Sequence, residues 1–240
     1  MKSSASWCEQ FGRDHGLERT IGEIMVADNS QGVEGPGKTI NVGIIGAGAI
    51  AQRGHIPEFL SIPGVNLVAI SSRSEKRVKQ VAEKAGIPSY YTDYQKMLNS
   101  EEIDAVSICT PTYLHSEMTR ACCEAWKHVL CEKPIATSID EAKVMIKSAR
   151  DYDVILMIQH NKRFNPHIEL AKDFIDEGRL GDLISIRAKF GTGGASDWSP
   201  TSKWFYQTGK GGGVLIDLGI HYADLINWFT EKYRLDTIFG

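Results

Sequence analysis

The segment TINVGIIGAGAIA at residues 39–51 limits the folds open to this chain more than any other feature. An apolar, β-branched run ends in Gly46-Ala47-Gly48, and the start of a helix follows directly. A strand, tight turn and helix in this order form a dinucleotide-binding unit, in which a pyrophosphate rests on backbone N–H groups at the helix N-terminus. Gly46 and Gly48 keep side chains away from the pyrophosphate, and Ala51 takes the third small position. Because glycine-rich turns also arise by chance, the position of this one after a buried strand gives it weight.

Strand and helix patterns alternate from residue 40 to residue 159. Strands are predicted at 40–45, 65–71, near Tyr90, 104–109, 128–131 and 154–159, and helices at 49–61, 74–85, 93–99, 114–126 and 139–152. This alternation implies a parallel sheet covered by helices on both faces, with ligand at the carboxyl ends of the strands. We therefore predict an α/β fold with a Rossmann-type doubly wound parallel sheet, in a dinucleotide-binding domain over residues 39–158.

The pattern changes on both sides of this domain. Residues 1–38 are rich in Ser, Gly and charge, which predicts a loosely attached, flexible extension. Residues 159–240 predict the first part of an α+β open-sheet substrate domain. Its expected elements are a helix from Asn165-Pro166 to Gly178, a strand at 182–190, a loop at 191–213, a helix at 217–229 and an apolar run at 235–239. Because two strands make a marginal sheet, we expect this second domain to be incomplete.

Composition restricts the partners of the chain. Its 240 residues carry a net charge of -3, with a pI near 6.2 and no basic run of five or more, which argues against nucleic acid and anionic lipid. Five cysteines without CxxC spacing favour reduced thiols over zinc or disulfides. Neither a secretory signal nor a stretch of about 18 apolar residues is present. We expect a cytoplasmic protein that holds no metal and binds neither nucleic acid nor membrane.

The end of the second predicted strand, Ile70-Ser71-Ser72-Arg73, bears on the choice of nicotinamide cofactor. NAD is commonly recognised by an Asp or Glu about 20 residues after the glycines, and no acid stands here. Ser72 and Arg73 instead offer a hydroxyl and a guanidinium that suit the 2′-phosphate of NADP. We predict NADP as the preferred cofactor, with NAD as the alternative if Arg73 is only a solvated residue at a helix start.

Two further strand ends are expected at the same edge of the sheet. Thr110-Pro111-Thr112 follows the fourth strand, with His115 one helical turn later, as a cofactor neighbour or as a structural residue. Glu132-Lys133-Pro134 ends the fifth strand, which delivers the Lys133 ammonium to the edge that carries the glycine turn. The residues predicted to contact the cofactor are Gly46, Gly48, Ala49, Ile50, Ser72, Arg73, Thr110, Pro111, Thr112, His115, Glu132 and Lys133.

The glycine turn, CTPTYLH at 109–115 and CEKP at 131–134, taken in order, resemble the Gfo/Idh/MocA family of glucose-fructose oxidoreductase and inositol dehydrogenase. IQHNKRFNP at 158–166 is similar to the family's first substrate-domain segment, and GGGVLIDLGIHYADL at 211–225 to its catalytic helix. The resemblance implies hydride transfer between a nicotinamide cofactor and a sugar, inositol or related polyol, and a homo-oligomer for a full-length chain. Because members typically continue well beyond this length, we expect either a fragment or a short form with an exposed sheet edge.

The resemblance also implies a catalytic set of Lys133, Asp217 and His221. His221 would accept the hydroxyl proton, Lys133 would orient the oxygen and stabilise developing charge, and Asp217 would bind hydroxyls. The spacing agrees, because Asp217 and His221 stand at i, i+4 on one helix face, and the Lys133 cation would hold the pKa of the imidazole down. Asp224, three residues after His221, is placed to orient its ring. The alternative is that Asp217 is a helix cap and His221 a packing residue.

Substrate contacts are expected from both segments of the second domain. Asn161 and Arg163 follow the sixth strand, although Arg163 would serve equally well as the partner of a nearby carboxylate. Trp198 and Trp204 are candidates for stacking on a sugar ring, with a core position as the alternative. The predicted substrate-binding residues are Asn161, Arg163, Trp204, Asp217 and His221.

Besides the length of the chain, two features depart from the family pattern. Trp126 stands where members usually place a glycine at a helix C-terminus, and the 38-residue N-terminal segment is longer than usual.

A non-catalytic NADP(H)-binding protein or truncated subunit would bind the cofactor without turnover. Among enzymes, a dihydrodiol dehydrogenase or a reductase of a non-sugar carbonyl would use the same residues.

Overall fold

The computed structural model describes residues 39–99, 102–191, 193–194, 199 and 202–231. The predicted extension at 1–38, the apolar run at 235–239 and Trp198 lie outside these residues. The predicted boundary between residues 158 and 159 stays a prediction. No helix in the described part of the chain has the length and apolar character needed to cross a bilayer.

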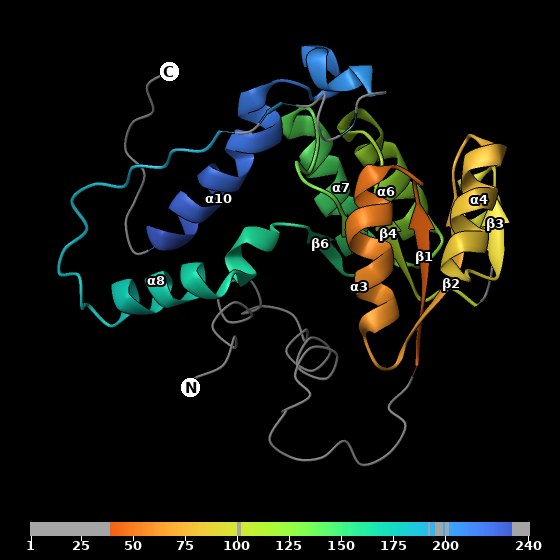
Figure 1. Ribbon diagram of the computed structural model, residues 1–240, viewed down its shortest axis with the longest axis horizontal. Helices are drawn as coiled ribbons and strands as arrows, with labels where there is room; N and C mark the ends of the chain where they lie inside the picture. The colour runs from red at the N-terminus through yellow and green to blue at the C-terminus, as the bar shows by residue number, and fades with distance from the viewer. Residues whose placement is uncertain (1–38, 100–101, 192, 195–198, 200–201, 232–240) are drawn as a thin grey trace. The chain divides into compact units, whose positions relative to one another are not determined.

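Six parallel strands form one sheet in the order β3-β2-β1-β4-β5-β6 (Figure 1). The strands are β1 (Ile40–Ile45), β2 (Val65–Ser71), β3 (Ser89–Tyr91), β4 (Ala105–Ile108), β5 (His128–Cys131) and β6 (Leu156–Ile158). This order places the switch in winding direction between β1 and β4, where ligands of doubly wound sheets bind beyond the carboxyl ends of the strands. The predicted Rossmann-type fold is confirmed.

Helices connect the strands and continue beyond the sheet. They are η1 (Ala51–His55), α3 (Ile56–Ser61), α4 (Glu75–Ala85), α5 (Tyr94–Leu98), η2 (Thr112–Leu114), α6 (His115–Glu124), α7 (Ile139–Asp151), η3 (Asn161–Phe164), α8 (Pro166–Asp176), η4 (Lys203–Tyr206), η5 (Thr208–Lys210), η6 (Leu215–Gly219) and α10 (Ile220–Phe229). Local signals explain several helix ends. Ser74 caps α4, which closes on the left-handed Gly86, and Ser138 caps α7 through the Glu141 N–H.

The sheet is buried on both faces, as doubly wound topology requires. On one face Ile44 and Ile70 pack with Ile56 of α3 and Val78 of α4. On the other face lie buried side chains from α5, α6 and α7, namely Met97, Met118 and Met145, packed with Ile108. Cys109, Cys122, Cys123 and Cys131 are buried free thiols.

Trp126 lies in the turn after α6, at the position where family members usually have a glycine. This residue adopts a φ of 59°, the left-handed conformation that a glycine would take more easily. Its ring is mostly exposed and contacts Tyr152 edge to face, with the ring centroids 5.6 Å apart. The chain therefore keeps the left-handed turn, although the residue differs from the one usual in the family.

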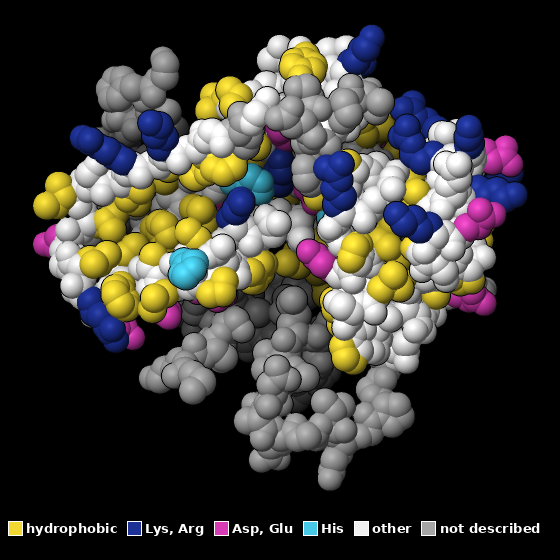
Figure 2. Space-filling model, viewed as in Figure 1, with side chains coloured by type: hydrophobic (Ala, Val, Ile, Leu, Met, Phe, Trp, Pro, Cys, Tyr) yellow, Lys and Arg dark blue, Asp and Glu magenta, His cyan; other side chains and the backbone are white. Residues whose placement is uncertain are grey.

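The strand predicted at residues 182–190 is wrong, because the structure gives these residues no strand. A strand requires a neighbour that pairs with its N–H and C=O groups, and no second sheet occurs among the described residues after 158. Ile184, which the pattern would bury, is 96% exposed. Figure 2 shows hydrophobic side chains gathered between α8 and α10. Leu170 of α8 and Ile226 of α10 are exposed.

Candidate functional site

The turn between β1 and the following helix contains two glycines with different structural roles. Gly46 has a φ of +109°, and a Cβ there would lie 2.5 Å from the Cys109 carbonyl oxygen, so no other residue fits. A Cβ on Gly48 would meet no atom within 4 Å, which leaves open backbone where the helix begins at Ala49 and Ile50. Open N–H groups at a helix start suit a pyrophosphate, so this turn fits a bound dinucleotide.

Ser72 and Arg73 follow β2 at the same edge of the sheet. The Ser72 N–H donates to the Tyr91 carbonyl at 3.0 Å, which extends the contact between β2 and β3. Arg73 is exposed, and Ser74 behind it caps α4 by accepting from the Arg77 N–H. The guanidinium therefore extends into solvent from the strand end at which a nucleotide ribose is expected.

The loop after β4 packs directly on the glycine run before η6. Thr112 is 1% exposed, and a Cβ on Gly211 would lie 2.7 Å from the Thr112 Cβ. Gly211 has a φ of +78°, so it supplies both the conformation and the close approach. Pro111 precedes Thr112 in extended conformation, and Thr110 donates its hydroxyl to the Met118 sulfur. Segments about a hundred residues apart in sequence therefore meet at the carboxyl edge of the sheet.

Lys133 connects the end of β5 to η6. Its Nζ donates to the Asp217 carbonyl oxygen at 2.6 Å and to Asp217 Oδ1 at 2.8 Å. Both side chains are largely shielded, with 15% of Lys133 and 20% of Asp217 exposed. The Lys133–Pro134 peptide bond is cis. Two of the predicted catalytic residues, 84 positions apart, are thus in direct contact.

His221 lies at the start of α10, one turn after Asp217. Burial, with smaller contributions from the Lys133 and Lys162 cations, lowers the pKa of His221 from 6.5 to about 4. The predicted direction is correct, but burial is the larger cause. Because the Nδ1 atom is buried without a hydrogen-bond partner in the described structure, Nε2 is the ring nitrogen left to exchange a proton. The neutral imidazole is a proton acceptor throughout the neutral pH range.

Comparison with known proteins places these segments in one family. The model of the oxidoreductase family with an NAD-binding Rossmann fold matches residues 40–160, and the model of the GFO/IDH/MocA C-terminal domain matches residues 168–235. The chain belongs to the Gfo/Idh/MocA family. The resemblance indicated by the glycine turn, CTPTYLH and CEKP is therefore confirmed.

Three members of the Gfo/Idh/MocA family illustrate the relationship. The uncharacterized oxidoreductase YrbE of Bacillus subtilis (strain 168) is 33% identical over 203 residues, which cover 82% of this chain and 57% of YrbE. The crystal structure of myo-inositol 2-dehydrogenase from Lactobacillus plantarum gives a TM-score of 0.73 at 31% identity, covering 81% of this chain and 57% of that one. A structure of levoglucosan dehydrogenase with NADH and levoglucosan gives 0.70 at 29%, covering 80% and 54%. The chain spans about half the length of these relatives.

His115 of this Gfo/Idh/MocA chain is enclosed by the protein, a position that suits the structural alternative left open by the sequence. The ring is completely buried, with Nδ1 at 2.9 Å from the Pro134 carbonyl oxygen and Nε2 at 3.0 Å from that of Thr110. Burial lowers the pKa of His115. The side chain has no exposed surface for a cofactor, so its predicted place among the cofactor contacts is not supported.

Arg163 and Asp224 form a pair that also corrects an expectation. Arg163 Nε donates to Asp224 Oδ2 at 2.6 Å, and Nη2 donates to Oδ1. Asp224 was expected to orient His221, but this two-point contact commits it to Arg163, because a guanidinium fork matches a carboxylate. Arg163 therefore follows the alternative in which it pairs with a carboxylate.

Asn161 and Trp204 lie on two short helices, η3 and η4. Asn161 is exposed in η3, next to His160. Trp204 in η4 is half-buried and stacks on Phe205, with the ring centroids 4.0 Å apart. Their predicted substrate contacts stay predictions.

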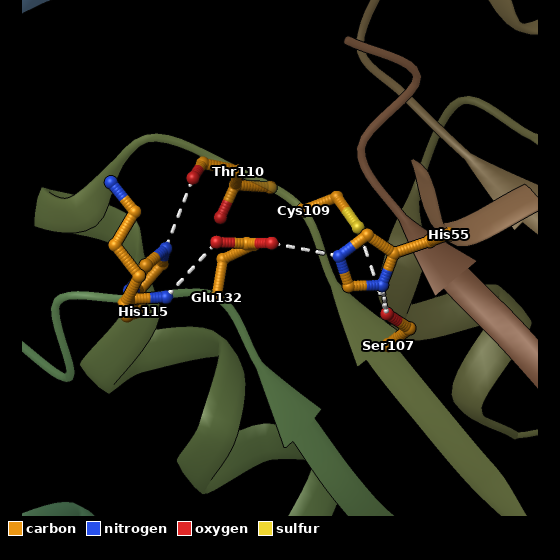
Figure 3. Close-up of polar contacts among 7 residues, drawn as sticks. His55, Ser107, Cys109, Thr110, His115 and Glu132 are labelled. Carbon is orange, nitrogen blue, oxygen red and sulfur yellow. Dashed lines mark hydrogen bonds and ion pairs between the residues drawn. The ribbon is translucent and has the colours of Figure 1, made fainter. Parts of the chain in front are cut away.

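The sequence analysis missed His55, which forms a buried polar cluster with Glu132 and Ser107 (Figure 3). His55 Nε2 lies 2.8 Å from Glu132 Oε1, and Nδ1 lies 2.8 Å from Ser107 Oγ. Burial lowers the pKa of His55, but hydrogen bonds with Cys109 and Glu132 outweigh it and raise the pKa to about 10. Glu132 Oε2 accepts from the Lys133 N–H at 3.1 Å. The carboxylate predicted to contact the cofactor is thus occupied within the protein.

His160 is a second residue that the sequence analysis missed. Its ring meets His221 edge to face, with the ring centroids 6.4 Å apart, and its Nδ1 lies 3.8 Å from Asp224 Oδ2. Burial lowers the pKa of His160. The IQHNKRFNP segment contains this histidine, but no spacing rule relates residue 160 to residue 221. Within the described residues, no group of three or more His, Cys, Asp or Glu side chains could hold a metal ion.

Proposed function

We propose that this chain forms the cofactor-binding part, and the first part of the substrate site, of an NADP(H)-dependent oxidoreductase. The reaction is hydride exchange at a carbon that carries a hydroxyl or carbonyl group, on a sugar, inositol or related polyol. The contact of the Lys133 ammonium with Asp217 at 2.8 Å, beside a neutral His221, carries the proposal. Relatives named myo-inositol 2-dehydrogenase and levoglucosan dehydrogenase support this substrate class.

Three side chains have separate roles in the reaction of the alcohol. The Lys133 ammonium hydrogen-bonds the substrate oxygen and stabilises the negative charge that develops there. His221 accepts the hydroxyl proton at Nε2, because Nδ1 is buried. Asp217 holds the ammonium in place and accepts from a neighbouring hydroxyl. A nicotinamide cofactor held at the glycine turn would supply the hydride acceptor for the carbinol carbon. In the reverse direction His221, as the imidazolium, returns the proton to the oxygen.

NADP is the proposed preferred cofactor, on the strength of Ser72 and Arg73 at the end of β2. A serine hydroxyl and an exposed guanidinium favour a 2′-phosphate, and no carboxylate stands at residues 72–74, directly after β2, to bind a 2′-hydroxyl. The levoglucosan dehydrogenase structure contains NADH, so the preference is a specific claim about this chain. Fluorescence titration with NADPH and NADH tests it, and tighter binding of NADH would contradict it.

A substrate panel tests the activity. Reduction of NADP⁺ is followed at 340 nm with inositols, aldoses, anhydrosugars and simple secondary alcohols, in the wild-type chain and in Lys133→Met. Turnover of one or more polyols that is lost in Lys133→Met supports the proposal. Equal turnover by both proteins contradicts the assigned roles. A dihydrodiol is assayed in the same way and a non-sugar carbonyl is assayed with NADPH, and faster turnover of either would select the second enzyme class.

A non-catalytic NADP(H)-binding subunit is the second candidate, and the exposed segment at 182–190 favours it. No second sheet pairs with that segment among the described residues. This candidate predicts quenching of tryptophan fluorescence by NADPH without turnover of any panel member. Association into a homo-oligomer through the apolar side chains between α8 and α10 belongs to the same proposal, and analytical ultracentrifugation measures it.

A further inference from the structure

Lys133 is held through the residues on both sides of it in the chain. Glu132 before it is 7% exposed, and its two carboxylate oxygens contact His55 and the Lys133 N–H. Pro134 after it has its carbonyl oxygen 2.9 Å from His115 Nδ1. Each neighbour of the lysine is therefore fixed by a different buried imidazole, as Figure 3 shows for the His55 side.

The two histidines come from the two connections that flank the switch in the sheet. His55 ends η1, the helical turn that begins after the glycines, and it is 3% exposed. His115 begins α6, directly after the loop that follows β4, and it is completely buried. A five-residue π turn at 51–55 shapes the backbone that carries His55, and such turns recur at functional sites.

We propose that His55 and His115 are positioning residues that fix the Glu132–Pro134 segment and thereby hold the Lys133 ammonium against Asp217. The kinetic part of this inference rests on the proposed function, whereas the positional part does not. Neither ring touches Lys133 Nζ in the described contacts, so both act through the backbone and through Glu132.

The hydrogen bonds around His55 can all form when both ring nitrogens carry a proton. Nε2–H donates to Glu132 Oε1 and Nδ1–H donates to Ser107 Oγ, each at 2.8 Å. Ser107 keeps its own proton to donate to Cys109 Sγ at 3.6 Å. Both ring N–H groups and the Ser107 hydroxyl then have acceptors, and the buried Glu132 carboxylate has a cationic partner. A buried carboxylate that loses such a partner is strongly destabilised, so a change at His55 acts directly on the residue before Lys133.

Trace acetylation of the folded chain measures the position of Lys133 without requiring turnover. Acetic anhydride at limiting concentration labels amines according to their accessibility and basicity, and peptide mass spectrometry compares Lys133 with the exposed Lys147 as an internal standard. The variants are His55→Gln, His115→Gln and the nearly isosteric Glu132→Gln. The matched control is His128→Gln on β5, where the ring accepts a backbone N–H from Ile155 at 3.1 Å.

The inference predicts that the Lys133 to Lys147 labelling ratio rises by about threefold or more in His55→Gln, His115→Gln and Glu132→Gln, because local opening exposes the amine. The ratio stays unchanged in His128→Gln. Circular dichroism verifies that each variant is folded, and Glu132→Gln keeps the test decisive if a histidine variant does not fold. Unchanged Lys133 labelling in the folded variants would overturn the inference.

Kinetics then separate this inference from the proposed function. If the chain turns over a polyol, kcat falls by about tenfold or more in His55→Gln and Glu132→Gln, because small misplacements of a catalytic group are costly. The Kd for NADPH stays within about twofold of wild type, and the double variant is no worse than the more severe single variant, since both act as one unit. If Lys133→Met keeps full activity, the proposed function fails, while the labelling result still decides the positional claim.

Discussion

Residues 40–158 and the described residues of 159–231 differ in how far they bury their apolar side chains. In the first region, Ile44, Ile108 and Met145 are completely buried between the sheet and its helices. In the second region, Ile184 is 96% exposed and Leu215 is 79% exposed. A doubly wound sheet builds its core from local strand–helix units, whereas a helix or extended segment needs a distant neighbour to cover it.

The candidate site draws on both regions. Lys133 comes from the sheet, and Asp217 and His221 come from the second region. The ion pair at 2.8 Å and the packing of Thr112 on Gly211 join the two. A well-packed sheet therefore supplies Lys133, and a more exposed helical segment supplies Asp217 and His221.

The largest expected effect is on kcat, from removing the Lys133 ammonium and with it the ion pair to Asp217. Lys133→Met should lower kcat for polyol oxidation by about 10² to 10⁴, the usual contribution of a positioned catalytic group. The Kd for NADPH should change far less, because the glycine turn is untouched. Lys147→Met, which removes an exposed lysine paired with Asp151, is the matched control and should leave both values unchanged. Steady-state kinetics and fluorescence titration measure the two effects.

The difference in burial between the regions predicts a difference in stability. Ile108→Ala should lower the free energy of unfolding by about 2–5 kcal/mol, because it opens a cavity in the sheet core. Ile184→Ala should change it by about 0.5 kcal/mol or less, since the side chain already faces solvent. Urea denaturation followed by circular dichroism compares them. Equal losses would mean that residues 182–190 are covered in solution.

The proposed preference for NADP rests on residues of the first region. Arg73→Gln should weaken NADPH binding by about tenfold, because a charge-assisted contact with the 2′-phosphate is lost, which corresponds to about 1.4 kcal/mol. NADH binding should stay within about twofold. Arg77→Gln, one turn further along α4, serves as the control for a general change in surface charge. A parallel loss for both nucleotides would contradict the assignment.

The smallest expected effect is a shift in the acid limb of the pH–rate profile. Because the pKa of His221 is lowered to about 4, the neutral imidazole predominates above that pH, and polyol oxidation should decline as pH falls through about 4. Removing the Lys133 cation should raise the pKa of His221 toward 6.5 without reaching it, since burial is the larger cause. The limb in Lys133→Met should therefore move to higher pH. An unmoved limb would show that the two groups are not coupled.

The sequence predicted the sheet and its edge well because the signals are local. Hydrophobic periodicity, the caps at Ser74 and Ser138, and the glycines at 46 and 48 each act within a few residues. The family resemblance grouped Lys133 with Asp217 and His221, but neither the resemblance nor any spacing predicted the direct contact of Lys133 with Asp217. Strand 182–190 failed because its pattern does not specify a pairing neighbour.

Two pairings in the site needed the folded structure. His55 meets Glu132 across 77 positions, and neither an isolated histidine nor the EKP motif indicates the other. Asp224 has suitable spacing for His221, but the guanidinium of Arg163 arrives from a distant segment and takes both carboxylate oxygens. Competition between partners for one buried charge is decided in three dimensions.

Isotope transfer tests the central claim most directly, that Lys133, Asp217 and His221 form one site for hydride transfer. The chain is incubated with NADPH deuterated at C4 of the nicotinamide and with a panel of ketoses and inososes, and the products are analysed by mass spectrometry. The account predicts a polyol with deuterium on the new carbinol carbon, formed about 10² to 10⁴ times more slowly by Lys133→Met. Absence of labelled product with every panel member, or equal rates for both proteins, would contradict it.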